Sequence, residues 1–310
     1  MPSATLDGLD LLLARVLAEY PAGHPIIPSK ATELWDDFAR NAFITGEAPD
    51  SYSNYVYGLL KSSGLIQRGS ISSGTWIADS KSAMKKALVG ADSRRGQAIK
   101  FYISGDTLDN IGNSLSSGDG YFGAAGLSKP WLASRTGTAA STDDLVAEIA
   151  YPNSPSHVYY YGLTKTVLWL HSYNLASHLA PNSNQVKKFL RDLTGTEPDD
   201  PRERDAIVFW SDYFARYITP LKSAAASLGA TLKKPLTVRD VQLAAWVLYS
   251  TKNLLKERPL KVSRKLTART LEGYMHSDAL NLGQLIERIG DIDLIDPYAS
   301  DLYSFLSGLP

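Results

Sequence analysis

The chain lacks cysteine altogether, and its 32 Lys plus Arg residues are balanced by 32 Asp plus Glu, so its formal net charge is zero. The absence of cysteine excludes disulfides, thiol catalysis, iron–sulfur clusters and cysteine-ligated zinc. A neutral chain is not a bulk electrostatic binder of nucleic acid, so any such contact must come from a local patch. No apolar run reaches the roughly 18 residues that a membrane helix needs. We therefore expect a cytoplasmic protein with no membrane partner.

The common nucleotide and hydrolase motifs are missing as well. The sequence contains no GxxxxGK[ST] phosphate loop, no HExxH and no G-x-S-x-G elbow. One GxGxxG string, residues 118–123, lies in a Gly/Ser-rich stretch with no strand running into it, which favours a flexible loop over a dinucleotide site. The five histidines show no metal-ligand spacing beyond the seven residues between His171 and His178. We expect no cofactor.

The pattern of the first part of the chain, 1–102, predicts helices followed by a hairpin. Apolar spacing predicts helices over 6–20 (amphipathic rather than a signal peptide), 31–44 and 50–62. The segments LIQRG and TWIAD then flank SISSG, which predicts a short β-hairpin within 65–79. Helices followed by a hairpin are the order of a winged-helix module, although a small α+β segment without a DNA role has the same order.

A composition change follows. Residues 103–142 hold seven glycines and many Ser and Thr, which predicts a long loop or linker between domains. The remainder, 143–310, has an almost purely helical pattern, so the expected fold class is mainly α with a small N-terminal α+β region. Its first expected helices are a short one starting at Thr142 or Asp143, one over about 157–175 with an interruption at Gly162, and one over 184–193. A long helix is expected from Asp200-Pro201 to about 228, and another follows a cap formed by Thr237 to Asp240. The last expected helices are 264–276, 280–289 and 297–307.

The most informative segment is 157–193. Helical geometry places Lys165 at the start of a helix, three residues after Gly162. It lies on the side of that helix away from the main apolar stripe. Free N–H groups at a helix start attract anions, and a lysine there adds a full positive charge. A second helix follows Pro181 and carries a basic face that includes Lys187 and Lys188. This pattern predicts a compact phosphate-binding unit.

The residues GLTKT at 162–166 and NSNQVKKF at 182–189 resemble the helix-hairpin-helix core of the DNA glycosylase superfamily. In that family a glycine-rich hairpin ends in Lys-Thr-Ala and contacts DNA phosphates, and an Asp about eighteen residues later stabilises positive charge at the sugar. The lysine corresponds to Lys165, and the Asp position falls on Ser183. The hairpin here has Gly162 alone, where the family has two glycines.

The missing Asp puts ordinary base excision in doubt, because a serine cannot carry its charge. The sequence is more similar to one branch of the superfamily, the α-glutamyl/putrescinyl thymine pyrophosphorylases and the phage amino acid:DNA transferases. The resemblance implies attack by an amine on a flipped thymine derivative that bears a 5-methyl pyrophosphate, with loss of pyrophosphate. It implies double-stranded DNA and a small amine donor such as glycine as partners, and the host cytoplasm as location if the protein is phage-encoded. Magnesium often assists pyrophosphate departure, but no motif here supports it.

The expected site follows from this resemblance. Lys165 is the expected ligand of pyrophosphate or DNA phosphate, His178 the expected proton acceptor, and Ser183 occupies the position of the family's Asp. Glu148 is a candidate for binding the substrate amine. One of Tyr159, Tyr160 and Tyr161 can stack on a flipped base, and at least one of them is expected only to pack. The expected substrate and DNA contacts are Tyr161, Gly162, Thr164, Thr166, Asn182, Asn184, Gln185, Lys187, Lys188, Arg264 and Lys265, the last two from the basic stretch 256–269.

Each assignment has a structural alternative. Lys165 can be a solvated helix lysine, Asn182 and Ser183 can be plain N-caps, His171 a core histidine and Glu148 a surface carboxylate. At the level of function, three alternatives to the transferase remain open. They are a glycosylase with Lys165 as nucleophile, a non-enzymatic DNA-binding protein, and a helical protein with no nucleic-acid role.

Overall fold

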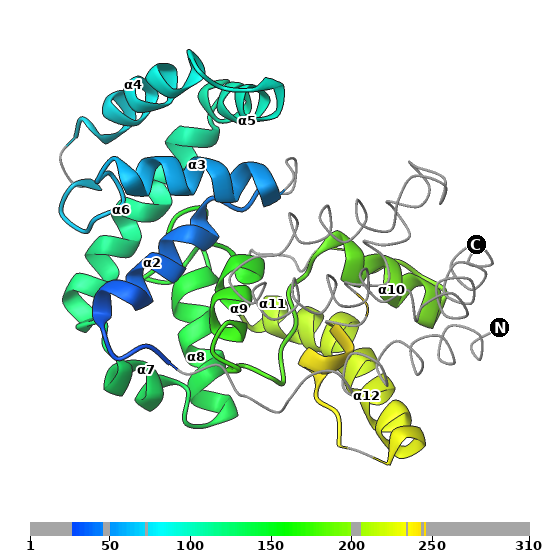
Figure 1. Cartoon of the computed structure of the whole chain (residues 1–310). Helices are drawn as coiled ribbons and strands as arrows, with labels where there is room; N and C mark the ends of the chain where they lie inside the picture. Colours follow the sequence, from blue (N-terminus) through cyan, green and yellow to red (C-terminus); the bar gives the residue numbers. More distant parts are fainter. Residues whose placement is uncertain are drawn as a thin grey trace. The chain divides into compact units, whose positions relative to one another are not determined.

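A computed structural model describes residues 27–45, 50–71, 74–199, 206–233, 235–242 and 245 (Figure 1). The chain divides into two compact units, one of Ile26–Tyr173 and one of Met1–Pro25 with Asn174–Pro310. All regular elements among the described residues are helices, which confirms the mainly α class. None of these helices is both long and apolar enough to cross a bilayer. The predictions outside the described residues are those for 6–20, Asp200-Pro201, the run to Leu255, 256–269 and the three last helices.

The core of the Ile26–Tyr173 unit forms where helices α2 (Ala31–Ala42), α6 (Thr107–Ala125) and α9 (Leu163–His171) pack on one another. Its centre is the fully buried ring of Phe38 on α2. That ring stacks on Tyr161 at 4.1 Å and meets the edges of Phe122 at 4.7 Å and Trp169 at 5.6 Å between ring centroids. Aromatic pairs of this geometry add specific attraction to their apolar burial.

Helix α6 overturns the prediction of a loop over 103–142 and of a flexible loop at its GxGxxG string. Its apolar residues recur at helical spacing and are buried, and two of its glycines, Gly112 and Gly118, are sites of close packing. A Cβ at Gly118 would lie 2.5 Å from Cε1 of Phe38, and one at Gly112 would lie 3.1 Å from the ring of Trp76. The buried apolar side chains of α6 are Leu108, Ile111, Leu115 and Phe122.

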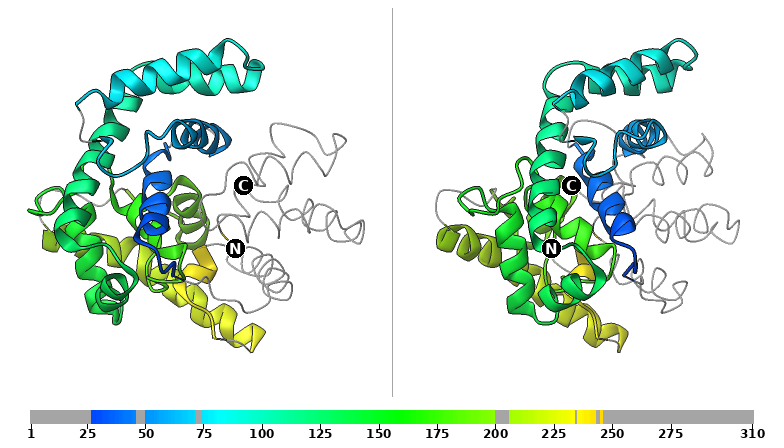
Figure 2. Two further views of the ribbon diagram at one scale, coloured as in Figure 1. Left: turned by 60° about the vertical axis from the view of Figure 1, so that its left-hand side comes forward. Right: turned by 90° about the vertical axis from the view of Figure 1, so that its left-hand side faces the viewer.

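Figure 2 shows α6 running beside α2, with α4 and α5 at its first end and α7 at its last. Helix α7 spans Lys129–Arg135, and α8 spans Ala139–Ala150, starting earlier than predicted because Thr138 and Ser141 form a capping box. The helices of 107–150 therefore belong to the same unit as α2, and the boundary between the units falls at Tyr173 rather than within 103–142.

The hairpin predicted within 65–79 is absent from the described residues there. Helix α3 (Asp50–Ser62) ends where predicted, and Gly64 follows it with a φ of 74°. Turns lead from there to α4 (Trp76–Leu88), which precedes α5 (Ser93–Ile103). The turns are fixed by two indole N–H groups rather than by a partner strand. Trp35 donates to the carbonyl of Ile66 at 2.7 Å, and Trp76 donates to that of Leu65 at 2.6 Å.

The other unit contains α10 (Asn184–Thr194), α11 (Ala206–Tyr213) and α12 (Thr219–Leu232), and α10 packs on α12. A π-helical turn, Phe214–Ile218, joins α11 to α12 within the long helix predicted up to 228. Pro near the start of α12 accounts for this turn, because a proline lacks the N–H and clashes with the carbonyl four residues earlier in a regular helix. Thr237 and Asp240 form the predicted cap, with Thr237 N donating to Asp240 Oδ2 at 2.7 Å.

Candidate functional site

The start of α9 has the geometry predicted for an anion-binding turn. Gly162 is its N-cap, in extended backbone, and nothing lies within 4 Å of the position that a Cβ would take there. The hydroxyl of Thr166 donates to the carbonyl of Gly162 at 3.1 Å and so faces the turn rather than solvent. Thr164 is half-buried. The N–H groups of the first helical turn have no partner four residues earlier within the helix, which is why helix starts attract anions.

Lys165 lies in this first turn, as predicted, and it is half-buried rather than the solvated helix lysine of the structural alternative. Helix α9 packs on both α2 and α8, so residues on two of its sides are buried, including Trp169 beside the lysine. Part of the surface of Lys165 remains accessible, while its ammonium group donates to the carbonyl of Ala42 at 3.0 Å. Burial lowers the pKa of Lys165 to about 8. No carboxylate among the described residues pairs with it, so its positive charge has only a neutral acceptor.

Tyr161 does not contact substrate as predicted, because it is fully buried. Its ring stacks on Phe38, and its hydroxyl donates to the carbonyl of Phe38 at 3.2 Å. The two preceding tyrosines have the opposite environment, since Tyr159 is 61% and Tyr160 56% exposed. The aromatic rings available to a ligand are therefore those of Tyr159 and Tyr160.

The remaining described candidates belong to the other unit. Ser183 is the N-cap of α10, and its hydroxyl accepts a hydrogen bond from Val186 N at 3.4 Å. Asn182, Gln185, Lys187 and Lys188 are half-buried and Asn184 is exposed, while Arg264 and Lys265 lie outside the described residues. The basic face of α10 is partly neutralised, because Arg191 pairs with Asp192 at 3.1 Å and Glu197 at 3.6 Å.

His178 is half-buried in the segment between α9 and α10. This segment is fixed from both sides within its unit. The hydroxyl of Tyr213 accepts from Ala180 N at 2.9 Å and donates to Ala180 O at 2.6 Å, and Arg239 N donates to Ser177 O at 3.0 Å. His171, by contrast, is buried in α9, as expected of a core histidine.

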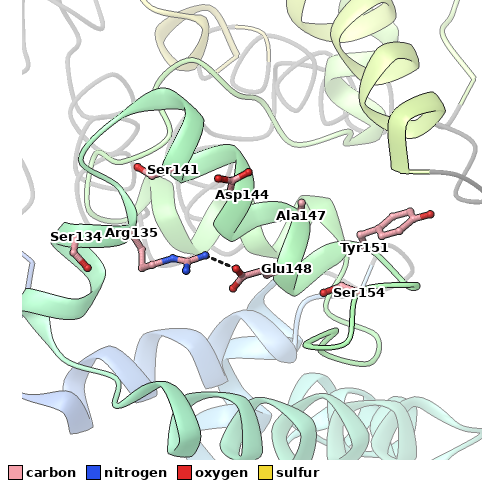
Figure 3. Close-up of a pocket in the computed structure, with 8 residues that line it drawn as sticks. All are labelled: Ser134, Arg135, Ser141, Asp144, Ala147, Glu148, Tyr151 and Ser154. Atoms are coloured by element: carbon pink, nitrogen blue, oxygen red, sulfur yellow. Dashed lines mark hydrogen bonds and ion pairs between the residues drawn. The ribbon is translucent and has the colours of Figure 1, made fainter.

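A hollow of about 530 Å³ lies between α7 and α8, and Glu148 is part of its wall (Figure 3). Arg135 Nη2 donates to Glu148 Oε1 at 2.6 Å, and the hydroxyl of Tyr121 donates to Glu148 Oε2 at 2.9 Å. Burial, followed by the hydrogen bond and negative charge of Glu148, raises the pKa of Tyr121. Asp144, one helical turn before Glu148, is exposed. The lining residues are Ser134, Arg135, Ser141, Asp144, Ala147, Glu148, Tyr151 and Ser154.

The hollow carries one guanidinium against two carboxylates, so its lining favours a cationic group such as an amine. Glu148 was predicted from the sequence as a candidate for binding an amine. Arg135 and Tyr121 were not predicted to take part, because both lie within 103–142, which was predicted to be a loop. A helical interpretation of that stretch would have placed Arg135 at the end of a short helix before Glu148. Within the described residues, no three His, Asp or Glu side chains are placed to hold a metal ion.

Comparisons of the chain with protein-family models, with curated proteins and with solved structures find no match.

Proposed function

We propose that this protein is a DNA-modifying transferase that replaces the pyrophosphate of 5-(pyrophosphooxymethyl)uracil in double-stranded DNA with an amino acid or a polyamine. The observation that carries the proposal is the state of Lys165. Lys165 is half-buried, its pKa is about 8, and the hydrogen-bond acceptor of its ammonium group is the neutral carbonyl of Ala42. A buried charge without a counterion is unfavourable unless an anion joins it. A phosphate or pyrophosphate group supplies that anion.

The proposed reaction is a displacement at the exocyclic methylene carbon of the flipped base. The donor amine forms a C–N bond there, the C–O bond to pyrophosphate breaks, and pyrophosphate leaves with the electron pair. The amine loses a proton to a base in this step. Lys165 and the first-turn N–H groups of α9 stabilise the negative charge on the leaving group.

Ser183 supports this chemistry over cleavage of the glycosidic bond. Resemblance to the glycosylase superfamily places Ser183 where a carboxylate stabilises the developing sugar cation. A serine hydroxyl carries no charge, and here it caps Val186 N. Displacement at the methylene carbon leaves the sugar uncharged, so it requires no carboxylate at this position.

The hollow between α7 and α8 is the proposed site of the amine donor. Its two carboxylates, Asp144 and Glu148, exceed its one guanidinium, Arg135. A primary ammonium group can pair with Asp144, while the carboxylate of an amino-acid donor can compete with Glu148 for Arg135.

The test is mass spectrometry of nucleosides from DNA treated with the protein. The duplexes carry thymine, 5-hydroxymethyluracil or its pyrophosphorylated form, with glycine, glutamate or putrescine as donor. We expect a mass gain on the pyrophosphorylated base alone, loss of the gain in Lys165→Met, and normal turnover in Lys129→Met, which alters an exposed lysine. An unchanged product yield in Lys165→Met would overturn the proposed role of this lysine.

A second candidate is a glycosylase that uses Lys165 as its nucleophile, and the pKa of Lys165 is what favours it. With a pKa of about 8, roughly a tenth of the amine is neutral at pH 7, far more than for an ordinary lysine. Attack on the sugar carbon would give an imine that borohydride reduces to a stable protein–DNA adduct. Trapping of that adduct, with release of free base, would identify the glycosylase. Binding without any chemical change would leave a non-enzymatic DNA-binding protein.

A further inference from the structure

Two neighbouring tyrosines are exposed in a unit whose other large aromatic side chains are mostly buried. Tyr159 and Tyr160 keep 61% and 56% of their surface exposed, whereas Tyr161 is fully buried. Among the described residues, Val89 is the other exposed large hydrophobic side chain. Since exposed aromatic rings are unfavourable in water, a pair of them side by side in the sequence points to a contact surface.

The backbone that carries these rings is fixed. Ser114 on α6 donates to the carbonyl of Tyr159 at 2.7 Å, and Tyr159 N donates to Ser117 on the same helix at 3.0 Å. The ring of His157 meets that of Tyr159 edge to face at 5.4 Å. Tyr159 is thus held by its backbone and on one edge of its ring, while most of its surface stays exposed.

Tyr160 has a backbone φ of 56°, in the left-handed region that a tyrosine disfavours. Such a conformation persists where the surroundings impose it, and it is frequent at binding sites. Here the hydrogen bonds of Tyr159 precede it and the buried ring of Tyr161 follows it. A glycine would adopt this φ without strain, so the tyrosine occupies this position against the local backbone preference.

The turn that presents the two rings continues directly into the start of α9. Gly162 is exposed, with open space beside it, and Lys165 lies in the first helical turn. The same short segment therefore offers planar aromatic surface and, next to it, the N–H groups of a helix start. These two features match the two parts of a nucleotide, a base and a phosphate.

We propose that Tyr159 and Tyr160 form a stacking surface for unpaired bases of DNA. Stacking on aromatic side chains is how proteins hold bases that have left the duplex, and it tolerates any base because each has a π-face. The inference rests on the proposed function in taking DNA as the nucleic acid. It goes further in assigning the base contact to these two tyrosines and not to Tyr161.

The test is binding of fluorescein-labelled DNA to the full chain, followed by anisotropy. The probes are a fully paired duplex and the same duplex with a bulge of unpaired bases. We expect the natural protein to prefer the bulged duplex. Tyr159→Ala and Tyr160→Ala should each weaken binding to the bulged duplex roughly 5- to 100-fold, the range for loss of one stacked base. Tyr159→Phe and Tyr160→Phe should bind normally, because stacking needs the ring and not the hydroxyl.

Two controls separate a binding role from a structural one. Tyr160→Gly relieves the positive φ, so it should melt no lower than the natural protein while binding the bulged duplex as weakly as Tyr160→Ala. Val89→Ala removes the exposed apolar side chain of another segment and should bind normally. The fold loss in the alanine variants should be equal at 50 and 200 mM salt (about those concentrations), because stacking releases no counterions.

Equal affinity of the natural protein for the two duplexes would overturn the inference, as would normal binding by both alanine variants. These duplexes carry no pyrophosphorylated base, so the result is independent of transfer chemistry. A stacking effect without any mass gain on modified DNA would reject the proposed transferase and keep the stacking surface. A mass gain with normal binding by the alanine variants would do the reverse.

Discussion

Replacing Lys165 with methionine should make the protein more stable at pH 7. Burial holds the pKa of Lys165 at about 8, against an ordinary value of 10.5. At about 1.4 kcal/mol per pH unit, the charged lysine therefore destabilises the folded state by about 3 kcal/mol. Methionine fills a similar volume without charge, but it gives up the hydrogen bond to Ala42 O, worth about 1 kcal/mol. The expected net gain in the free energy of unfolding is about 2 kcal/mol.

The pH dependence of stability identifies the cause. Because the pKa of Lys165 is lower in the folded state, the unfolded chain binds more protons between pH 8 and 10.5, and stability rises with pH across this window. The natural protein should gain about 2 kcal/mol from this lysine between about pH 7 and 9.5, and Lys165→Met should lack the gain. Tyr57, Tyr121 and Tyr173 have raised pKa values and lower the stability above pH 10, but they do so equally in both proteins.

Urea unfolding at the two pH values measures both quantities, with Lys129→Met as the control for removing an exposed lysine. The control should match the natural protein at each pH. The reasoning is refuted if Lys165→Met is less stable than the natural protein at pH 7. It is also refuted if the difference in stability between the two proteins is the same at both pH values.

Four further substitutions test the fold and the hollow. Gly118→Ala places a Cβ 2.5 Å from the buried ring of Phe38 and should lower the free energy of unfolding in urea by about 1–3 kcal/mol. The matched control is Gly120→Ala on the same helix, whose Cβ meets nothing within 4 Å. It should raise the free energy of unfolding by up to about 1 kcal/mol. Ser183→Ala removes the cap of α10 and should cost about 1 kcal/mol, and a thermal melt equal to that of the natural protein would contradict the capping role. Asp144→Asn should raise the KM for the amine donor several-fold, because Asp144 is the proposed partner of the donor's ammonium group. The substitution should change stability by less than about 0.5 kcal/mol, because Asp144 is exposed; an unchanged KM would place the donor elsewhere.

Local sequence patterns predicted several helices well. The apolar spacing of 31–44 and 50–62 anticipated α2 and α3, and the amphipathic pattern of 184–193 anticipated α10 almost residue for residue. In each case one face is apolar and the opposite one polar. For α3 the stop residue Gly64 marks an end, and for α10 the cap residue Ser183 does. The ends of such helices can therefore be predicted from the local sequence.

The stretch 103–142 could not be interpreted in the same way. Its glycines suggest a loop when they are considered alone. In the structure, however, the missing Cβ atoms of Gly112 and Gly118 leave room for the rings of Trp76 and Phe38, which lie far away in the sequence. Whether a glycine breaks a helix or lets a neighbouring element approach depends on that neighbour. The pairing is a tertiary property, so composition in a window of the chain does not contain it.

The candidate site was likewise predictable in part. Lys165 could be selected from the sequence because it follows a glycine at a helix start, but its burial depends on α2 and α8 packing on two sides of α9. Periodicity identifies one apolar stripe and leaves the second side undetermined. The same limit explains why Tyr161, which is buried, was among the residues predicted to contact the substrate.

The proposed role of Lys165 as the cation for an anionic leaving group can be measured on the residue itself. We would follow the titration of its side-chain amine by NMR on lysine-labelled protein, assigning the signal by its loss in Lys165→Met, with and without pyrophosphate. A pKa of about 8 in the free protein, raised when pyrophosphate is bound, is the expected result, because an anion favours the charged form. A pKa near the ordinary value of about 10.4 in the free protein, or one that does not move at saturating pyrophosphate, would contradict it.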